Sequence, residues 1–281
     1  MEKRPRTIQI FLPYGSPRGI KIAEITNRTV QAILIPRNEF NRISERHEIQ
    51  NVGIYFLFGH DEENSKPQVY IGEAENCYKR LNTHNKEKDF WEVVVVFVTN
   101  NPQNQFTKSD VKYLENLSYL KAVENNRFYI NQTIPQQTFV PEWRKADLED
   151  IFNTIKILLS TLGYPLYESM RKVSETDESE IYFCSNNEVS AKGEYNEEGF
   201  IVFKGSSVRP LTTKAFKAKS KRDKLIEDKV IIEKDGKFIF YEDYQFTSPS
   251  LAASIVLGRN QNGWIAWKNK AGKTLDEIKR Q

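Results

Sequence analysis

The chain has 281 residues, of which 39 % are hydrophobic and 28 % are charged, and its formal net charge is +3. This composition is typical of a globular protein of about two domains. No apolar run approaches the ~18 residues that a membrane helix needs. The basic start is not followed by a long apolar stretch, which argues against a secretory signal, so we expect a cytoplasmic protein without a membrane partner. The charge is too small to indicate a nucleic-acid partner, so any such surface must be a local patch.

The positions of the cysteines and histidines in the sequence match no metal-binding motif. Cys77 and Cys184 lie far apart and match no metal-binding spacing, so we interpret them as free thiols. His47, His60 and His84 do not form a zinc-binding set either. The sequence therefore predicts neither a disulfide framework nor a zinc site.

The N-terminal part predicts short strands. Apolar and polar residues alternate through "TIQIFLP", "GIKIAEI" and "VQAILIP", between residues 7 and 35, which predicts three antiparallel strands. Residues 37–49 carry Phe40, Ile43 and His47 at helical spacing and predict a short helix. Residues 1–45 would thus be a β-rich extension, which either lengthens the sheet of the next domain or forms a separate clamp.

Residues 46–170 alternate strands and helices. The predicted strands are residues 53–58, 68–72 and 90–99, and the last is a β-branched run that we place at the centre of a sheet. The predicted helices are residues 76–84, 111–125 and 141–165.

The two long helices of this part have clear signals at their ends. Thr107 and Asp110 resemble a capping box in front of the helix at 111–125. Gly163 and Pro165 close the helix at 141–165. The apolar face of the first of these helices is predicted to be Val111, Leu114, Leu117 and Val123.

The C-terminal part predicts a second small α+β domain at residues 181–281. A charged stretch without apolar periodicity, residues 171–180, is the best candidate for a linker. Asp235-Gly236 is a hairpin signal, and Ser248-Pro-Ser250 begins a short capped helix. Trp264 and Trp267 are more often core residues of a small domain than a platform for base stacking.

A basic run within residues 212–229 is the main charged feature of this domain. The run reads as a helix with Lys214, Lys217 and Lys221 among its cations. Such a run is usually a solvated helix face, and the neighbouring carboxylates dilute it. It would also suit phosphate contacts, so these three lysines are candidate substrate-binding residues.

Two tripeptides carry a family resemblance. Gly53-Ile54-Tyr55 and Tyr70-Ile71-Gly72 are followed by Arg80, His84 and Glu115 at suitable spacing. With these residues the sequence resembles the GIY-YIG nuclease superfamily over about residues 50–135. Asn131 matches the asparagine that usually closes the motif set, and Asn126 is its rival.

The resemblance implies a fold and an activity. The implied fold is α+β, with a small α/β/α domain at residues 46–170 in which helices flank a short antiparallel sheet. The implied activity is a Mg²⁺-dependent (or Mn²⁺-dependent) endonuclease that hydrolyses phosphodiester bonds of DNA, with RNA as another possible substrate. The oligomeric state, the cleavage specificity and the biological pathway stay open.

The resemblance also implies a role for each site residue. Tyr55 would be the general base, Tyr70 would position the phosphate or the water, and Arg80 would grip the phosphate. A free tyrosine has a pKa of ~10, so Tyr55 would need a cation or a hydrogen-bond partner to lower it. His84 would bind Tyr55 or the phosphate, and Glu115 would hold the metal. Gly72 and Asn131 would lie on the substrate side of the site.

One residue departs from the family pattern. Glu73 follows Tyr-Ile-Gly, where several family members have lysine. A carboxylate cannot donate to a phosphate, so Glu73 would either repel the substrate or help to bind the metal. Glu73 therefore motivates a second hypothesis, a nuclease fold that binds nucleic acid with weak or no cleavage. A protein-interaction scaffold is a third hypothesis.

The C-terminal part carries a second resemblance. The Ser-Pro-Ser-x-Ala-Ala stretch from Ser248, followed by Asn262-Gly263-Trp264 and Trp267, resembles a small domain that is often fused to these nucleases in bacteria. It also resembles modules attached to restriction enzymes and DNA methylases. The resemblance implies that residues 181–281 bind DNA.

Overall fold

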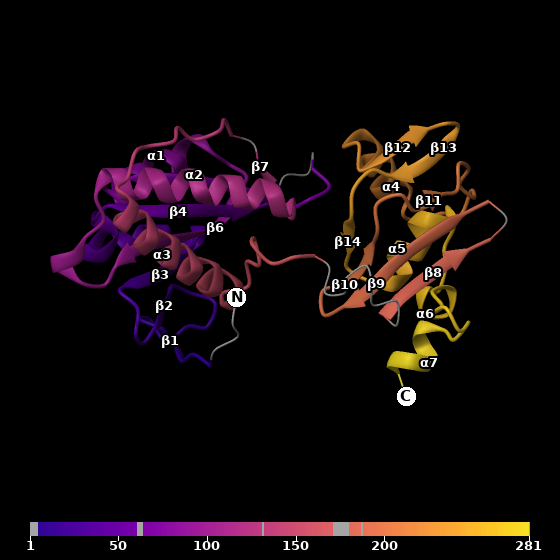
Figure 1. The fold of residues 1–281 in the computed structure, drawn as a ribbon, viewed down its shortest axis with the longest axis horizontal. Helices are drawn as coiled ribbons and strands as arrows, with labels where there is room; N and C mark the ends of the chain where they lie inside the picture. Colours follow the sequence, from indigo (N-terminus) through magenta and orange to yellow (C-terminus); the bar gives the residue numbers. More distant parts are fainter. Residues whose placement is uncertain (1–4, 61–63, 131, 171–179, 187, 281) are drawn as a thin grey trace. The chain divides into compact units, whose positions relative to one another are not determined.

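The computed structural model describes residues 5–60, 64–130, 132–170, 180–186 and 188–280. The chain divides into two compact units, Met1–Glu168 and Ser169–Gln281, and each combines helices with β-sheet (Figure 1). The predicted α+β class is confirmed. The predicted linker at 171–180 lies outside the described residues, apart from Glu180. No helix in the described ranges is both long and apolar enough to cross a membrane.

The N-terminal unit contains one seven-stranded sheet. Its strands are β1 (Ile8–Phe11), β2 (Lys21–Ile25), β3 (Val30–Pro36), β4 (Gly53–Gly59), β5 (Gln68–Ala74), β6 (Trp91–Thr99) and β7 (Tyr129–Ile130). They follow the order β1-β2-β3-β6-β4-β5-β7, and β5 with β7 is the parallel pair. The β-branched strand β6 lies centrally, as predicted. The three N-terminal strands lengthen this sheet, so the clamp alternative for residues 1–45 is wrong.

The two faces of the sheet have separate cores, because side chains alternate along each strand. The helices α2 (Lys108–Asn125) and α3 (Glu142–Thr161) cover one face, where Ile54 and Phe56 belong to the core (Figure 1). The other face is covered by α1 (Cys77–Glu87) and by the 3₁₀ helices η1 (Arg37–Glu45) and η2 (His47–Gln50). Tyr55 belongs to this second core. Tyr55 therefore faces α1, whereas its two chain neighbours face α2 and α3.

The predicted end signals of the helices are confirmed. Thr107 and Asp110 form a capping box at the start of α2, and each side chain bonds the other residue's backbone N–H. The helix α3 ends two residues before Gly163, whose φ of +95° is the left-handed conformation that glycine adopts at low cost. A further 3₁₀ turn, η3 (Pro102–Asn104), precedes α2.

Two expectations for the N-terminal unit are wrong in detail. Residues 37–49 form two 3₁₀ segments rather than one α-helix, because the chain becomes extended at Arg46 and interrupts the helical turns. Val123 is 49 % exposed, whereas Ala122 and Ser118 are buried. Val111 and Leu114 are buried as predicted, and the buried face of α2 then continues through the small residues Ser118 and Ala122 rather than through Val123.

The C-terminal unit contains two antiparallel sheets. One has the order β14-β10-β9-β8, and the other has the order β11-β13-β12. Their strands are β8 (Ile181–Ser185), β9 (Ser190–Asn196), β10 (Gly199–Val202), β11 (Ser207–Val208), β12 (Ile231–Lys234), β13 (Lys237–Phe240) and β14 (Tyr244–Phe246). The helices are α4 (Lys219–Glu227), α5 (Pro249–Leu257), α6 (Gly263–Ala266) and α7 (Leu275–Lys279).

Local signals in this unit are also confirmed. Asp235 and Gly236 have φ angles of +51° and +72° and form the tight turn between β12 and β13. Ser248 caps α5 by accepting a hydrogen bond from the backbone N–H of Leu251. Trp267 is fully buried and its ring stacks on Phe200 at 4.2 Å, so it is a core residue.

Candidate active site

The pairing of β4 with β5 places the two tyrosines together. Tyr55 lies opposite Gly72 in the register, and Tyr70 stands on the same face of the sheet. The two tyrosine rings are 6.4 Å apart and nearly parallel. A Cβ atom at Gly72 would lie 2.3 Å from the hydroxyl oxygen of Tyr55, a distance that real Cβ contacts do not show. The glycine of the second tripeptide therefore makes room for the tyrosine of the first.

The helix α1 brings Arg80 and His84 to the tyrosines. Asn76 caps this helix by accepting a hydrogen bond from the backbone N–H of Lys79, and Arg80 and His84 follow one turn apart on one side. The Nε2 atom of His84 is 2.8 Å from the hydroxyl oxygen of Tyr55. The His84 ring is also 5.2 Å from that of Tyr70. His84 is buried, whereas Arg80 is exposed to solvent.

The environment of His84 keeps this residue neutral. Burial, followed by the charges of Arg80 and Lys88, lowers its pKa to about 4. Its Nδ1 atom has no protein partner among the residues described. Either the Tyr55 hydroxyl donates to Nε2, or Nε2–H donates to the Tyr55 oxygen. The structure thus offers a proton route between a tyrosine and a neutral imidazole.

The environment of Tyr55 favours its protonated form. Burial raises the pKa of the Tyr55 hydroxyl, the nearby Tyr70 raises it further, and a hydrogen bond with Arg80 lowers it. We expected a neighbouring cation to lower this pKa. Arg80 acts in that direction, but burial outweighs it, because an ionised phenol loses its hydration inside the protein.

Glu115 acts on Tyr55 from the opposite face of the sheet. It is carried by α2, and burial followed by the charge of Glu73 raises its pKa to about 7. Lys108, Lys112 and Arg80 act in the opposite direction. The charge of Glu115 also contributes to the raised pKa of Tyr55, so the two residues are electrostatically coupled.

The structure gives Glu73 a partner. Glu73 pairs with Ile54 in the register and therefore points to the face covered by α2, away from Tyr70 and Gly72. Its carboxylate forms an ion pair of 2.7 Å with the ammonium group of Lys108, and its side chain is only 13 % exposed. Lys108 thus partly neutralises the charge that we expected to repel a phosphate.

The oxygen ligands here fit a magnesium ion. Mg²⁺ usually binds one or two carboxylates and keeps several waters. Glu115 is a half-buried carboxylate with a raised pKa, and a divalent cation would relieve its repulsion from Glu73. No cluster of three or more His, Cys, Asp or Glu side chains occurs in the described ranges, so no closed metal cage exists there.

The sequence did not predict one contact at this site. The side-chain amide of Gln132 accepts a hydrogen bond of 2.7 Å from the backbone N–H of Ile71 and donates one of 2.9 Å to its carbonyl. Gln132 thereby continues the short β5–β7 ladder along the Tyr-Ile-Gly strand. Asn131 lies outside the described residues. Asn126, the alternative candidate, ends α2 in a left-handed conformation, and its side-chain oxygen accepts a hydrogen bond from Lys66.

The three candidate lysines belong to the C-terminal unit and do not share one helix. The predicted helix at 212–229 begins only at Lys219, and Lys214 and Lys217 lie in the turns before it. Asn260 holds these turns by bonds to the backbone of Lys217 and Ala215. Lys221 is half-buried over the ring of Tyr244, at 5.7 Å.

Comparison with known proteins concerns the C-terminal unit. Residues 182–279 match the family described as Domain of unknown function (DUF4357). This unit is therefore similar to a family without an assigned activity. No curated protein and no solved structure matches the chain.

Proposed function

We propose that the protein is a Mg²⁺-dependent endonuclease of the GIY-YIG type that hydrolyses phosphodiester bonds of DNA in the cytoplasm. The observation that carries the proposal is the 2.8 Å contact between the Tyr55 hydroxyl and His84 Nε2, packed against Gly72. Tyr70, Arg80 and Glu115 lie close enough to act on the same hydroxyl. Residues from two strands and two helices thus influence the ionisation of one hydroxyl group.

Arg80 is the phosphate-binding group in this proposal. Its guanidinium is exposed and permanently charged, and it interacts with both Tyr55 and Tyr70. An exposed cation beside two hydroxyl groups can bind a phosphate through charge-assisted hydrogen bonds. The substrate phosphate would therefore lie between α1 and the tyrosines of β4 and β5.

Tyr55 and His84 supply the proton transfer. With Nε2–H of His84 and the guanidinium of Arg80 both donating to the Tyr55 oxygen, negative charge on that oxygen is stabilised. A tyrosinate so stabilised removes a proton from the attacking water. Because the pKa of Tyr55 is raised, only a small fraction of the Tyr55 hydroxyl groups is ionised before substrate and metal bind.

Glu115 would hold the metal. When bound, Mg²⁺ would polarise the phosphate and stabilise the leaving oxygen. Glu115 must lose its proton to bind a cation, and its pKa of about 7 permits this at neutral pH. Lys108, which forms the ion pair with Glu73, also acts to lower the pKa of Glu115 and so favours its ionised form.

The experiment is a plasmid-nicking assay with Mg²⁺. Tyr55→Phe and Glu115→Gln should each lower the cleavage rate by at least about 100-fold, because each removes a group that acts on the reacting atoms. Tyr119→Phe, on the same helix as Glu115 but without a part in the proposed site, is the control and should cleave like the wild type. Equal nicking by all four proteins would exclude this site.

A binding protein without cleavage is the second candidate. The observation that favours it is the raised pKa of Tyr55, which opposes the ionised form that a general base needs. This candidate predicts metal-independent binding of DNA or RNA and no cleavage with Mg²⁺ or Mn²⁺. Measuring binding and cleavage on the same samples separates the two candidates.

A further inference from the structure

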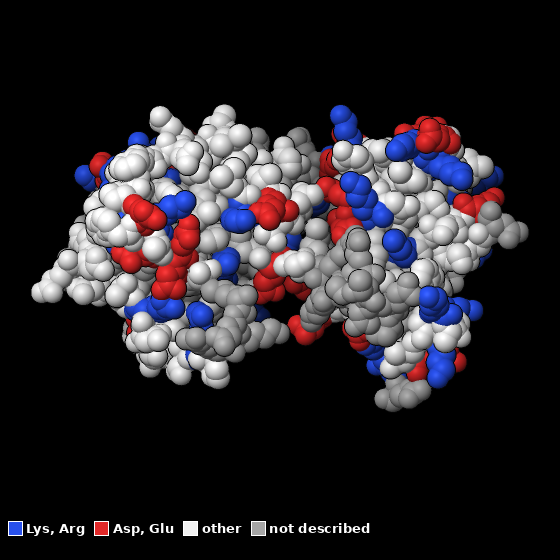
Figure 2. Space-filling view, viewed as in Figure 1, with Lys and Arg blue, Asp and Glu red and all other residues white. Residues whose placement is uncertain are grey.

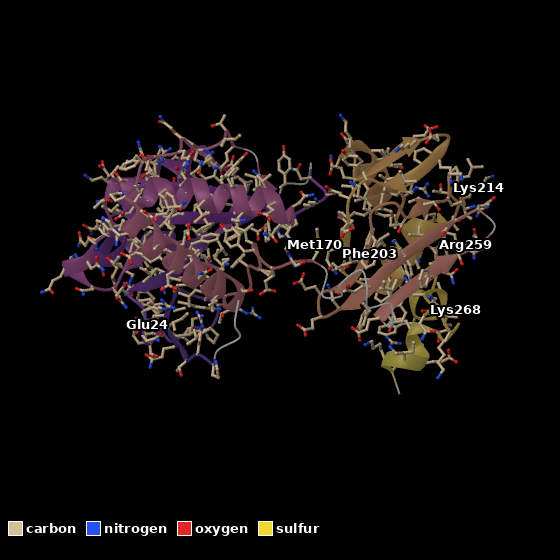
Figure 3. The ribbon with its side chains drawn as sticks, viewed as in Figure 1. Glu24, Met170, Phe203, Lys214, Arg259 and Lys268 are labelled. Atoms are coloured by element: carbon tan, nitrogen blue, oxygen red, sulfur yellow. The ribbon has the colours of Figure 1, made fainter. Side chains whose placement is uncertain are left out.

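The strongest feature outside the nuclease-like site is a group of cations in the C-terminal unit. We call it the basic loop surface, formed by the side chains of Lys214, Lys217 and Arg259. Figure 3 labels Lys214 and Arg259 near one another in this unit. All three side chains are exposed. They come from two segments that are about forty residues apart in the sequence, so only the fold brings them together.

Hydrogen bonds hold the two segments against each other. The backbone N–H of Thr213 donates to the carbonyl of Gly258 at 2.9 Å. Asn260 accepts from the backbone N–H of Lys217 at 3.0 Å and donates to the carbonyl of Ala215 at 2.8 Å. The backbone segments that carry the three cations are therefore fixed relative to each other. This lowers the conformational entropy that is lost when a ligand binds.

Within the described part of the chain, no carboxylate forms an ion pair with the cations of this surface. None of the three side chains forms an ion pair with a residue that the structure describes, whereas the nearby Arg209 is paired with Glu188 at 2.8 Å. Figure 2 shows acidic and basic side chains interspersed on the visible face of each unit, so neither unit is uniformly basic on that face. The positive charge is local.

A buried cation lies beneath the surface. Arg222 is 2 % exposed and donates to the carbonyls of Arg209 and Pro210. Its Nη1 atom has no protein partner within the described ranges and would lie 3.0 Å from a Cβ atom at Gly258, the residue before Arg259. Burial lowers the pKa of Arg222, and the carboxylate of Asp223 acts in the opposite direction. Arg222 thus adds a buried positive charge next to the backbone that carries Arg259.

We propose that the basic loop surface binds the phosphate backbone of duplex nucleic acid. Repeated phosphates match several fixed cations, and their counterions are released on binding. The aromatic residue of these segments, Phe216, is 6 % exposed and offers no ring for base stacking, which single strands would use. Backbone contacts read no bases, so binding is independent of sequence. This role goes beyond the proposed cleavage, since it lies in the other unit and needs no hydrolysis.

The test measures binding of a short fluorescent DNA duplex to the full chain carrying Glu115→Gln, with EDTA present. The triple variant Lys214→Ala, Lys217→Ala, Arg259→Ala should bind at least about tenfold more weakly at low salt, and the slope of log affinity against log salt should fall by about 2 to 3. Duplexes of unrelated sequence should give equal affinities. A single strand of the same length should bind more weakly.

A matched control separates this surface from net charge. The triple variant Lys192→Ala, Lys234→Ala, Lys237→Ala removes the same charge from exposed positions of the same unit and should keep most of the affinity. Circular dichroism should show that both variants fold. Equal losses in the two variants, or no loss in the first, would overturn the proposal.

Two further results would also overturn it. One is binding to vesicles of phosphatidylserine and phosphatidylcholine that the first variant abolishes while duplex binding stays intact. The other is a preference for the single strand. Failure of the plasmid-nicking assay would leave this test unaffected, because the binding is measured without cleavage.

Discussion

At the residue scale, Gly72 shows how a single missing side chain shapes the candidate site. A Cβ atom there would collide with the hydroxyl of Tyr55 at 2.3 Å and with the ring behind it at 2.5 Å. Gly72→Ala should therefore displace Tyr55 from His84. The expected loss is roughly 1–3 kcal/mol in unfolding free energy, together with at least tenfold slower cleavage. Urea denaturation and the nicking assay measure these two effects.

The control for this prediction is Gly19→Ala, where the nearest atom to a new Cβ is Ser16 Cβ at 3.3 Å. That variant should lose less stability and keep full activity. The double variant Gly72→Ala, Tyr55→Phe should lose somewhat less stability than the sum of its parts, because the collision with the hydroxyl is removed while the collision with the ring remains. Strict additivity would contradict the proposed collision.

Glu115 predicts a pH-dependent stability of the metal-free protein. Burial and Glu73 raise its pKa from a usual value of 4.5 to about 7. Since the folded-state pKa is the higher one, the stabilisation by this group is complete below the usual value and is lost as the pH rises through about 7. Glu115→Gln should therefore stabilise the protein at pH ~8 by about 2 kcal/mol, after allowance for solvent screening.

Urea denaturation with EDTA at acidic and alkaline pH checks this effect. The difference between wild type and Glu115→Gln should vanish at low pH and grow at high pH. Added Mg²⁺ should stabilise the wild type more than the variant. Glu124→Gln, which changes an exposed carboxylate on the same helix, should show no such growth. A constant difference at all pH values would contradict the assigned environment of Glu115.

At the element scale, Asp110 and Arg144 join α2 to α3. Arg144 donates two hydrogen bonds to the Asp110 carboxylate, at 3.0 and 2.9 Å, and the Asp110 side chain is 3 % exposed. Asp110 also belongs to the capping box of α2. Burial acts to raise the pKa of Asp110, but the bonds from Arg144 and Thr107 outweigh it and lower the pKa. The pair therefore positions the helix that carries Glu115.

Arg144→Leu should destabilise the N-terminal unit by about 3 kcal/mol, because it leaves a buried carboxylate without its partner. The wild-type pair stabilises the protein above the usual aspartate pKa of ~3.9 and loses this effect as the pH falls through the lowered folded-state value. The variant should therefore differ most from wild type at neutral pH and less in acid. Lys145→Leu removes an exposed pair on the same helix and should change stability by less than ~0.5 kcal/mol.

At the scale of the whole molecule, the two units have separate cores. The buried residues of each apolar cluster come from one unit. We therefore expect two calorimetric transitions. Trp267→Ala should lower one of them, since it deletes a buried ring worth roughly 3–5 kcal/mol, and should leave the other unchanged. Leu114→Ala should lower the other transition and leave the first one unchanged. A shift of both transitions by either variant would indicate one cooperative unit.

Local signals in the sequence determined most of the secondary structure. The alternation of residues 7–35, the capping box at Thr107 and the turn at Asp235-Gly236 each depend on neighbours in the chain, and the structure confirms them. The two tripeptides and the spacing of Arg80 and His84 also belong to this group. Each is a pattern of a few consecutive residues, so the chain alone reveals it.

Only the tertiary structure decided how these parts act on each other. The burial of Tyr55 and the contacts of Gln132 with Ile71 depend on segments that are distant in sequence. The same holds for Lys108, which reaches Glu73 across 35 positions, and for Arg259 beside Lys214. A pKa or an ion pair is set by every charge and surface within a few ångströms, and the linear sequence does not contain these distances.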